Sequence, residues 1–114
     1  MTVYITNAFS LGMLAKAPTT ITVEEIDVSS ARKIVGAARE RGELVSAVGH
    51  EATAKLLTGI LGEDVAYNRV PIKLTDGDVV VVFQLLDRIP EGKILSVEEI
   101  RAMKYKFYLV RVVE

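Results

Sequence analysis

The one histidine of this chain, His50, stands where an extended apolar segment gives way to a helical pattern, with Gly49 before it and Thr53 one turn further on. The first backbone N–H groups of a helix lack partners within the helix and form a natural binding site for a phosphate. Histidine changes its charge near neutral pH, and a bound anion favours its protonated form. This spacing favours general acid catalysis on a phosphate, and it fits equally well a histidine that only caps its own helix.

Other polar side chains that suit a phosphate ligand lie near the ends of predicted strands. Asn7 and Ser10 follow the first strand, where open α/β sheets commonly bind ligands, although Ser10 also suits a helix cap. Arg69 lies in the segment Ala66-Tyr67-Asn68-Arg69-Val70, and Gln84 and Arg88 flank the carboxyl end of a later strand. Arginine pairs with phosphate through two parallel hydrogen bonds, so a phosphate site is one interpretation of these residues. Solvated strand ends are the other.

A loop at residues 89–93 contains a proline and a glycine, which favour an irregular, hinged backbone. Glu91 in this loop either faces solvent or, on a closing lid, positions a sugar hydroxyl or the histidine. Asp76 and Asp78 fall in a predicted turn, where carboxylates more often shape the backbone. We therefore assign no acid or base role to these two aspartates.

The apolar patterns predict an α/β fold: a mixed sheet of about five strands flanked by short helices. Extended segments are expected at residues 3–7, 18–23, 44–48, 65–74, 79–86 and 105–113. The turn at Asp76 and Gly77 predicts a hairpin that joins residues 65–74 to 79–86, with Pro71 at an edge or irregular position.

Capping residues and glycines predict where the helices begin and end. Helices are expected at residues 10–14, at 31–41, from about His50 to Gly62, and at 96–103. Asp27, Ser29 or Ser30 caps the second of these, and Gly42 ends it. Ser96 and Glu99 form a capping box for the last one.

The composition limits the classes of protein and site. Without cysteine and with one histidine, the chain has no disulfide, no thiolate nucleophile and no histidine-rich metal site of its own. Lys and Arg number 14 against 15 Asp and Glu, and the net charge of −1 argues against duplex DNA binding. The 114 residues predict one domain spanning 1–114, with no apolar run long enough to span a membrane. No secretory signal is visible, so we expect an intracellular protein.

Four blocks of the sequence carry a resemblance to a known family. They are Asn7-Ala8-Phe9-Ser10-Leu11-Gly12-Met13-Leu14, Ser46-Ala47-Val48-Gly49-His50-Glu51-Ala52-Thr53, Asn68-Arg69-Val70 and Arg88-Ile89-Pro90-Glu91-Gly92-Lys93-Ile94-Leu95. In this order and spacing they resemble the type III anti-CRISPR ring nucleases, small proteins of archaeal viruses with bacterial and CRISPR-associated relatives. The resemblance extends over nearly the whole chain.

The resemblance implies a metal-independent phosphodiesterase that cleaves cyclic tetra-adenylate, the second messenger of type III CRISPR immunity. The products would be linear di-adenylates with 2′,3′-cyclic phosphate ends, and their formation would switch off the effectors that the messenger activates. A homodimer is also implied, with the ligand across its two-fold axis, where each subunit presents the same residues to opposite halves of the ring. No cofactor is implied, because the substrate's own ribose 2′-hydroxyl is the nucleophile.

The same resemblance implies roles for individual residues. His50 matches the general acid that protonates the departing 5′-oxygen, Arg88 the cation that stabilises charge at the phosphate, and Glu91 the lid carboxylate that completes the site on closure. Ligand-holding positions are matched by Asn7, Ser10, Thr53, Arg69 and Gln84. Gly12 stands where family members often have asparagine, so one ligand contact is absent or comes from the backbone.

Two other functions are compatible with the sequence. One is a non-catalytic protein that sequesters the messenger, or another small anion, in the same pocket. The other is a small protein or DNA interaction module. Either a viral anti-CRISPR or a cellular regulator of a CRISPR response would have these features.

Overall fold

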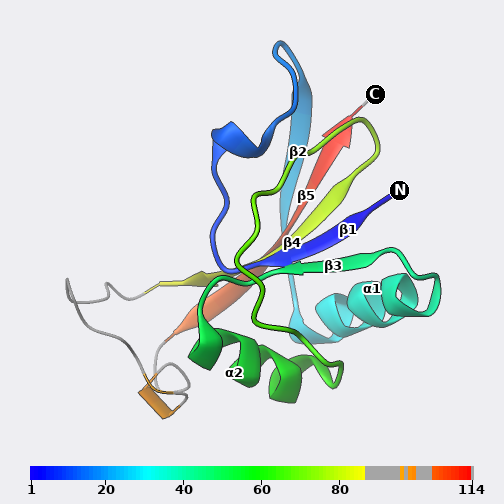
Figure 1. Ribbon diagram of the computed structural model, residues 1–114. Coiled ribbons are helices and arrows are strands. Elements are labelled where there is room, and N and C mark those ends of the chain that lie inside the picture. The colour runs from blue at the N-terminus through cyan, green and yellow to red at the C-terminus, as the bar shows by residue number, and fades with distance from the viewer. Residues whose placement is uncertain (87–95, 97, 100–103, 114) are drawn as a thin grey trace.

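Five strands form one mixed β-sheet. The strands are β1 (Val3–Thr6), β2 (Thr20–Ile26), β3 (Leu44–Ala47), β4 (Val79–Leu85) and β5 (Tyr105–Val113). Their order in the sheet is β2-β5-β4-β1-β3 (Figure 1). The computed structural model describes residues 1–86, 96, 98–99 and 104–113. β1 is parallel to β3 and β4, whereas β5 is antiparallel to β4 and β2. The predicted α/β fold with a mixed sheet of about five strands is confirmed.

The central strand, β4, is buried on both faces of the sheet. The helices are α1 (Val28–Glu40), α2 (Glu51–Leu61) and the short 3-10 helix η1 (Leu11–Met13). Val79, Val81 and Phe83 pack on the face that α1 and α2 cover (Figure 1). Val80 and Val82 pack on the opposite face, against η1 and irregular segments of the chain. Burial on both faces explains why this strand is a continuous apolar run instead of an alternating one.

The ends of the two longer helices follow the predicted signals, with one shift. Asp27 caps α1, since its carboxylate accepts a hydrogen bond of 2.7 Å from the backbone N–H of Ser30. For this reason α1 begins at Val28, earlier than the expected start at residue 31. Gly42 and Gly62 follow α1 and α2 with φ angles of 70° and 69°, a left-handed conformation that glycine adopts without strain.

β2 lies further along the chain than residues 18–23, where we expected it. It pairs with β5 residue by residue, from Thr20 opposite Val113 to Ile26 opposite Phe107. The start of β2 therefore coincides with the end of β5 at Val113, and the end of β2 is followed directly by Asp27, the N-cap of α1.

The predicted hairpin between residues 65–74 and 79–86 is wrong. Residues 65–74 form no strand and make only isolated bridges, from Tyr67 to Val48 and from Leu74 to Leu14. β1 and β5 already occupy both edges of β4, so no edge is left for another strand. A turn does exist here, because the backbone N–H of Asp78 donates to the carbonyl of Thr75 over 3.0 Å, but it connects β4 to an irregular segment.

The capping box before the last predicted helix is present. The backbone N–H of Ser96 donates to the Glu99 carboxylate, the backbone N–H of Glu99 donates to the Ser96 hydroxyl, and both distances are 3.2 Å. Residues 98–99 are helical, whereas most of the predicted 96–103 helix and the whole 89–93 loop lie outside the described residues. In the part of the chain that the structure describes, no helix has the length and apolar character needed to cross a membrane.

Asp78 shapes the backbone at the start of β4, as expected for an aspartate in a turn. Its carboxylate accepts hydrogen bonds from the backbone N–H of Thr2 (3.1 Å) and from both the backbone N–H and the hydroxyl of Thr75 (3.0 Å each). Burial raises the pKa of Asp78, but these hydrogen bonds outweigh it and hold the pKa below its ordinary value of 3.8. The ionised form of Asp78 therefore stabilises the fold.

We predict that Asp78→Ala lowers the free energy of unfolding at neutral pH by about 1–3 kcal/mol, because three donors lose the carboxylate that accepts their hydrogen bonds. A carboxylate with a lowered pKa contributes stability above pH 3.8, and this is lost as the pH falls through the folded-state pKa. The difference between wild type and variant should thus shrink in urea titrations below pH 3.8. Asp76→Ala, in the same turn but exposed, is the control, and an equal loss from both variants would contradict the assignment.

Candidate functional site

The candidate site lies at the edge of the sheet where the parallel strands β1, β3 and β4 end. The register places Thr6 beside Ala47 on one side and beside Val82 on the other. Beyond these ends, the backbone N–H of Gly49 donates to Oδ1 of Asn7 over 3.3 Å. Open α/β sheets bind ligands at this edge. The hydrogen bond joins two of the sequence blocks that we expected to share a site.

His50 occupies the N-cap position of α2. Its backbone is extended, with φ −135° and ψ 121°, and its Nδ1 accepts a hydrogen bond of 3.4 Å from the backbone N–H of Thr53. The helix-cap interpretation of His50 is therefore correct. Capping uses only one ring nitrogen, and Nε2 has no hydrogen-bond partner among the described residues. The second nitrogen is free to exchange a proton with a ligand.

Thr53 lies against His50 and is only 4% exposed. Its hydroxyl oxygen lies 3.1 Å from His50 Nδ1. A hydroxyl can donate to an unprotonated Nδ1 and accept from a protonated one, whereas the backbone N–H can only donate. Thr53 can thus give the imidazole a partner in both of its charge states.

A hollow of about 510 Å³ lies on the face of the sheet away from α1 and α2. Gly49, the residue before the histidine, lines it, whereas His50 itself does not. Three of the predicted ligand-holding residues line it: Asn7, Ser10 and Arg69. Among the lining residues in the described part of the chain, Arg69 alone is charged. The volume falls within the usual range for small-ligand sites, and the lining combines one cation with amide and hydroxyl groups.

Ser10 is free to contact a ligand because it does not cap η1 through its side chain. It stands at the N-cap position of that 3-10 helix, yet its hydroxyl makes no capping hydrogen bond. At Gly12, an added Cβ atom would meet only Ser10 Oγ, at an ordinary contact distance of 3.7 Å. The glycine therefore leaves part of the hollow open where a larger side chain could stand.

Asn68 and Thr6, which the sequence did not point to, hold Arg69 and the end of β1 in place. Asn68 donates from its backbone N–H to the Val48 carbonyl (2.9 Å) and from its side chain to the Ser46 carbonyl (2.7 Å), which fixes the chain just before Arg69. Thr6, 3% exposed, donates to the Ala47 carbonyl over 3.2 Å and lines the hollow. The only signal for them in the sequence is that Asn68 directly precedes Arg69 and Thr6 directly precedes Asn7.

Gly49 makes room for the arginine. A Cβ atom there would lie 3.2 Å from Arg69 Cγ, closer than most such contacts. We expected this glycine to let the backbone approach a ligand, and in the described structure it lets the Arg69 side chain lie against the backbone.

The remaining predicted residues lie apart from the hollow or outside the described residues. Gln84 is exposed at the end of β4, on the same face as Val82, and its side chain donates to the Leu85 carbonyl over 3.0 Å. It does not line the hollow. Arg88 and Glu91 lie outside the residues that the structure describes, so their predicted roles stay predictions.

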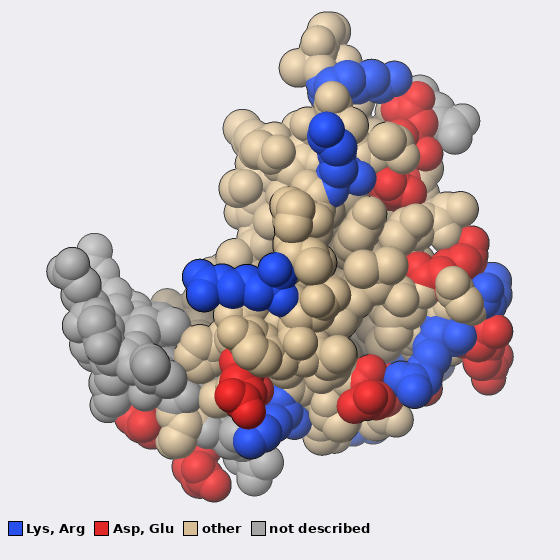
Figure 2. All heavy atoms as spheres, in the orientation of Figure 1, with Lys and Arg blue, Asp and Glu red and all other residues tan. Residues whose placement is uncertain are grey.

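The charges on the surface are mixed. On the face drawn in Figure 2, acidic and basic side chains of the described residues are interspersed over a largely uncharged surface. That view contains no broad positive tract of the kind that binds duplex nucleic acid. Within the described part of the chain, no three His, Asp or Glu side chains gather as a metal site would require.

The comparisons with known proteins agree on one family. The family model described as STIV B116-like matches residues 3–107. "Uncharacterized protein 26" of Sulfolobus islandicus filamentous virus (isolate Iceland/Hveragerdi) is 36% identical over 111 residues, which cover 96% of this chain and 91% of that protein. "Uncharacterized protein ORF116" of Acidianus filamentous virus 1 is 36% identical over 114 residues, covering 96% and 94%. The solved structure of B116 of Sulfolobus turreted icosahedral virus matches with a TM-score of 0.82 and 36% identity, covering 97% of this chain and 99% of that one.

We predict that the capping role of His50 can be separated from any chemical role by substitution. His50→Ala should lower the free energy of unfolding by about 0.5–2 kcal/mol, because the Thr53 N–H loses its acceptor. His50→Asn should stay close to wild type, because asparagine is among the best N-cap residues. Urea denaturation of the three proteins measures this, and an asparagine variant as unstable as the alanine variant would contradict the cap.

Proposed function

This chain belongs to the STIV B116-like family, which has members in archaeal viruses, and we propose that it is a ring nuclease that cleaves cyclic tetra-adenylate without a metal ion. The observation that carries the proposal is the geometry of His50, which caps α2 through Nδ1 and keeps Nε2 without a hydrogen-bond partner among the described residues. His50 directly follows Gly49, which lines the hollow that contains Arg69. The resemblance of four sequence blocks to the anti-CRISPR ring nucleases supplies the substrate.

In the proposed reaction, a ribose 2′-oxygen of the substrate attacks the adjacent phosphorus, and the bond from phosphorus to the 5′-oxygen breaks. His50 gives its proton to the departing 5′-oxygen, while the 2′-hydroxyl proton passes to water or a base. Each cleavage leaves a 2′,3′-cyclic phosphate and a 5′-hydroxyl, and two cleavages convert the ring into two linear di-adenylates. General acid assistance of this kind is worth about 10²–10⁴ in rate.

The ligand would be held by the polar lining of the hollow. Arg69 offers a guanidinium to a phosphate, and Asn7 and Ser10 offer an amide and a hydroxyl. Gln84 lies at the end of β4, on the same face of the sheet as Val82, and by resemblance would also hold the ligand. By resemblance, Arg88 stabilises charge at the phosphate and Glu91 completes the site.

A homodimer with the ligand on its two-fold axis suits the surface around the hollow. Exposed apolar side chains lie on the segments that border it: Leu11 is 71% exposed, Tyr67 52% and Val70 41%. We expect a second copy of the chain to cover these side chains. In such a dimer, one histidine per chain gives two active centres.

We predict that His50→Ala and His50→Asn both slow single-turnover cleavage of cyclic tetra-adenylate by at least about 100-fold, while its dissociation constant stays within a few-fold of wild type. The asparagine variant keeps the helix cap, so its loss of rate reports the missing proton donor. Radiolabelled ligand in the presence of a chelator tests the metal independence at the same time. Cleavage by His50→Asn at the parental rate would overturn the proposal.

A second prediction concerns Thr53, whose hydroxyl we expect to position His50. Thr53→Val keeps the shape and the backbone N–H but removes the hydroxyl, and it should lower the single-turnover rate by about tenfold without weakening ligand binding. Thr53→Ser should restore most of the rate. If Thr53→Val instead weakens binding and leaves the rate of the bound complex unchanged, Thr53 holds the ligand as the resemblance implies.

The alternative function is a protein that binds the messenger without cleaving it. It is favoured by the same observation that His50 caps α2, since a cap needs no catalytic role. Intact cyclic tetra-adenylate that co-elutes with the protein after long incubation would support this alternative.

A further inference from the structure

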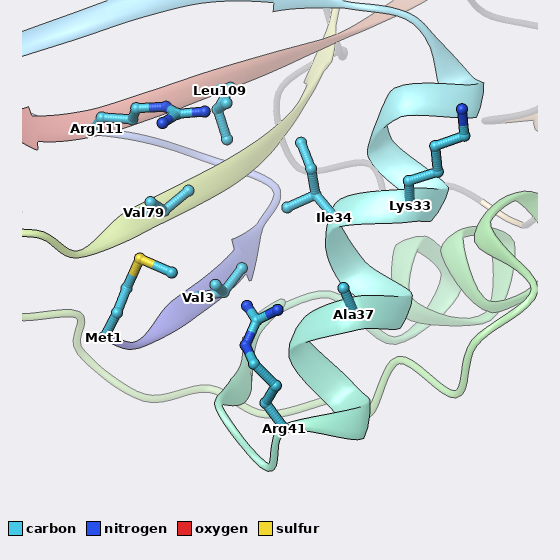
Figure 3. A pocket seen from close by; sticks show the side chains of 9 residues that line it. All are labelled: Met1, Val3, Lys33, Ile34, Ala37, Arg41, Val79, Leu109 and Arg111. Carbon is cyan, nitrogen blue, oxygen red and sulfur yellow. The ribbon is translucent and has the colours of Figure 1, made fainter.

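A second hollow lies at the opposite edge of the sheet from His50, between α1 and the first residues of β1 and β4 (Figure 3). Its volume is about 300 Å³. Val3, Val79 and Leu109 form its apolar floor and are 1%, 8% and 2% exposed. Ile34 and Ala37 of α1 form a side wall. The site shares no lining residue with the hollow that contains Arg69.

Two arginines bring positive charge to this apolar floor. The guanidinium groups of Arg41, from the end of α1, and Arg111, from β5, point toward the hollow (Figure 3). The Arg41 guanidinium is paired with Glu43, whereas the Arg111 guanidinium makes no hydrogen bond or ion pair with the part of the chain that the structure describes. One of the two guanidiniums is therefore fully available.

The position of Arg111 is unusual for a strand of this sheet. Side chains alternate along β5, and Phe107 and Leu109 both pack into the core beneath the helices. Arg111 is the next residue on that face, opposite Val79 of β4. The pattern calls for an apolar residue here, and the chain instead places a charge beside an apolar hollow.

We propose that this hollow binds a small organic acid, with its carboxylate between Arg41 and Arg111 and its hydrocarbon body on Val3, Val79 and Leu109. A guanidinium binds a carboxylate through two parallel hydrogen bonds. The apolar floor offers nothing to a bare inorganic anion but removes a hydrocarbon group from water. A volume at the lower end of ligand-site sizes suits a compact acid.

The experiment compares three probes on methyl-labelled protein by NMR and calorimetry: 4-phenylbutanoate, the matched neutral alcohol 4-phenylbutan-1-ol, and inorganic phosphate. We expect the carboxylate to bind saturably and to shift the methyl signals of Val3, Ile34 and Leu109. The alcohol should bind about tenfold more weakly because it lacks the charged hydrogen bonds, and phosphate should leave these methyl signals unchanged.

Variants assign the binding to this hollow. Arg111→Gln should weaken binding of 4-phenylbutanoate about tenfold, and Ala37→Leu, which fills the space from an exposed helix position, should abolish the methyl shifts. Arg39→Gln is the matched control, because Arg39 lies on α1, the helix that forms the side wall, but does not line the hollow and pairs with Glu63 instead. Cleavage of cyclic tetra-adenylate by Arg111→Gln should equal that of wild type, which keeps this test separate from the proposed nuclease.

Three results would overturn the proposal. The first is equal affinity for the carboxylate and the alcohol, and the second is the absence of saturable methyl shifts up to millimolar probe. The third is a loss of affinity in Arg39→Gln as large as that in Arg111→Gln. Thermal melting of each variant identifies any loss that comes from unfolding, and Ala37→Leu, on an exposed helix position, keeps the test decisive if Arg111→Gln is unstable.

Discussion

The burial of β4 between β1 and β5 is the constraint on which the rest of the structure depends. Its residues from Val79 to Phe83 are buried on both faces of the sheet, and the strand is hydrogen-bonded to β1 on one side and to β5 on the other. Because β1 and β3 run parallel to β4, the carboxyl ends of the three strands lie side by side. The segments that follow these strands therefore begin close together. Asn7 and Gly49 are hydrogen-bonded there for this reason, although they lie 42 positions apart in the sequence.

The two ring nitrogens of His50 differ in their hydrogen bonding. Nδ1 accepts from the Thr53 N–H and so stabilises the start of α2, while Nε2 has no hydrogen-bond partner among the described residues. A histidine tied at one nitrogen loses rotational freedom, which holds the other nitrogen in place before any ligand arrives. The cap and the acid are thus compatible roles: the first supplies the orientation that the second requires.

Much of the fold could be predicted because its signals are local. Asp27, Gly42 and Gly62 mark helix ends through their own backbone preferences, and the valine run identifies the buried strand directly. The failed hairpin at residues 65–74 shows the limit, since a turn signal at Gly77 says nothing about which strands already flank β4. At the site, single residue types indicated Asn7, Ser10 and Arg69, but the contact of Thr53 with His50 and the anchoring by Asn68 arise only from packing.

The same strand separates two positive sites of different chemistry. Arg69 lines a hollow of mixed polar and apolar residues at the carboxyl ends of the parallel strands, whereas Arg41 and Arg111 lie beside an apolar floor at their amino ends. The seven residues of β4 that lie between these edges extend about 20 Å at about 3.3 Å per residue. Exposed charges are largely screened beyond about 8–10 Å at physiological salt. A ligand at one edge therefore has little direct electrostatic effect on the other, and any coupling between them would have to pass through the packing of β4 itself.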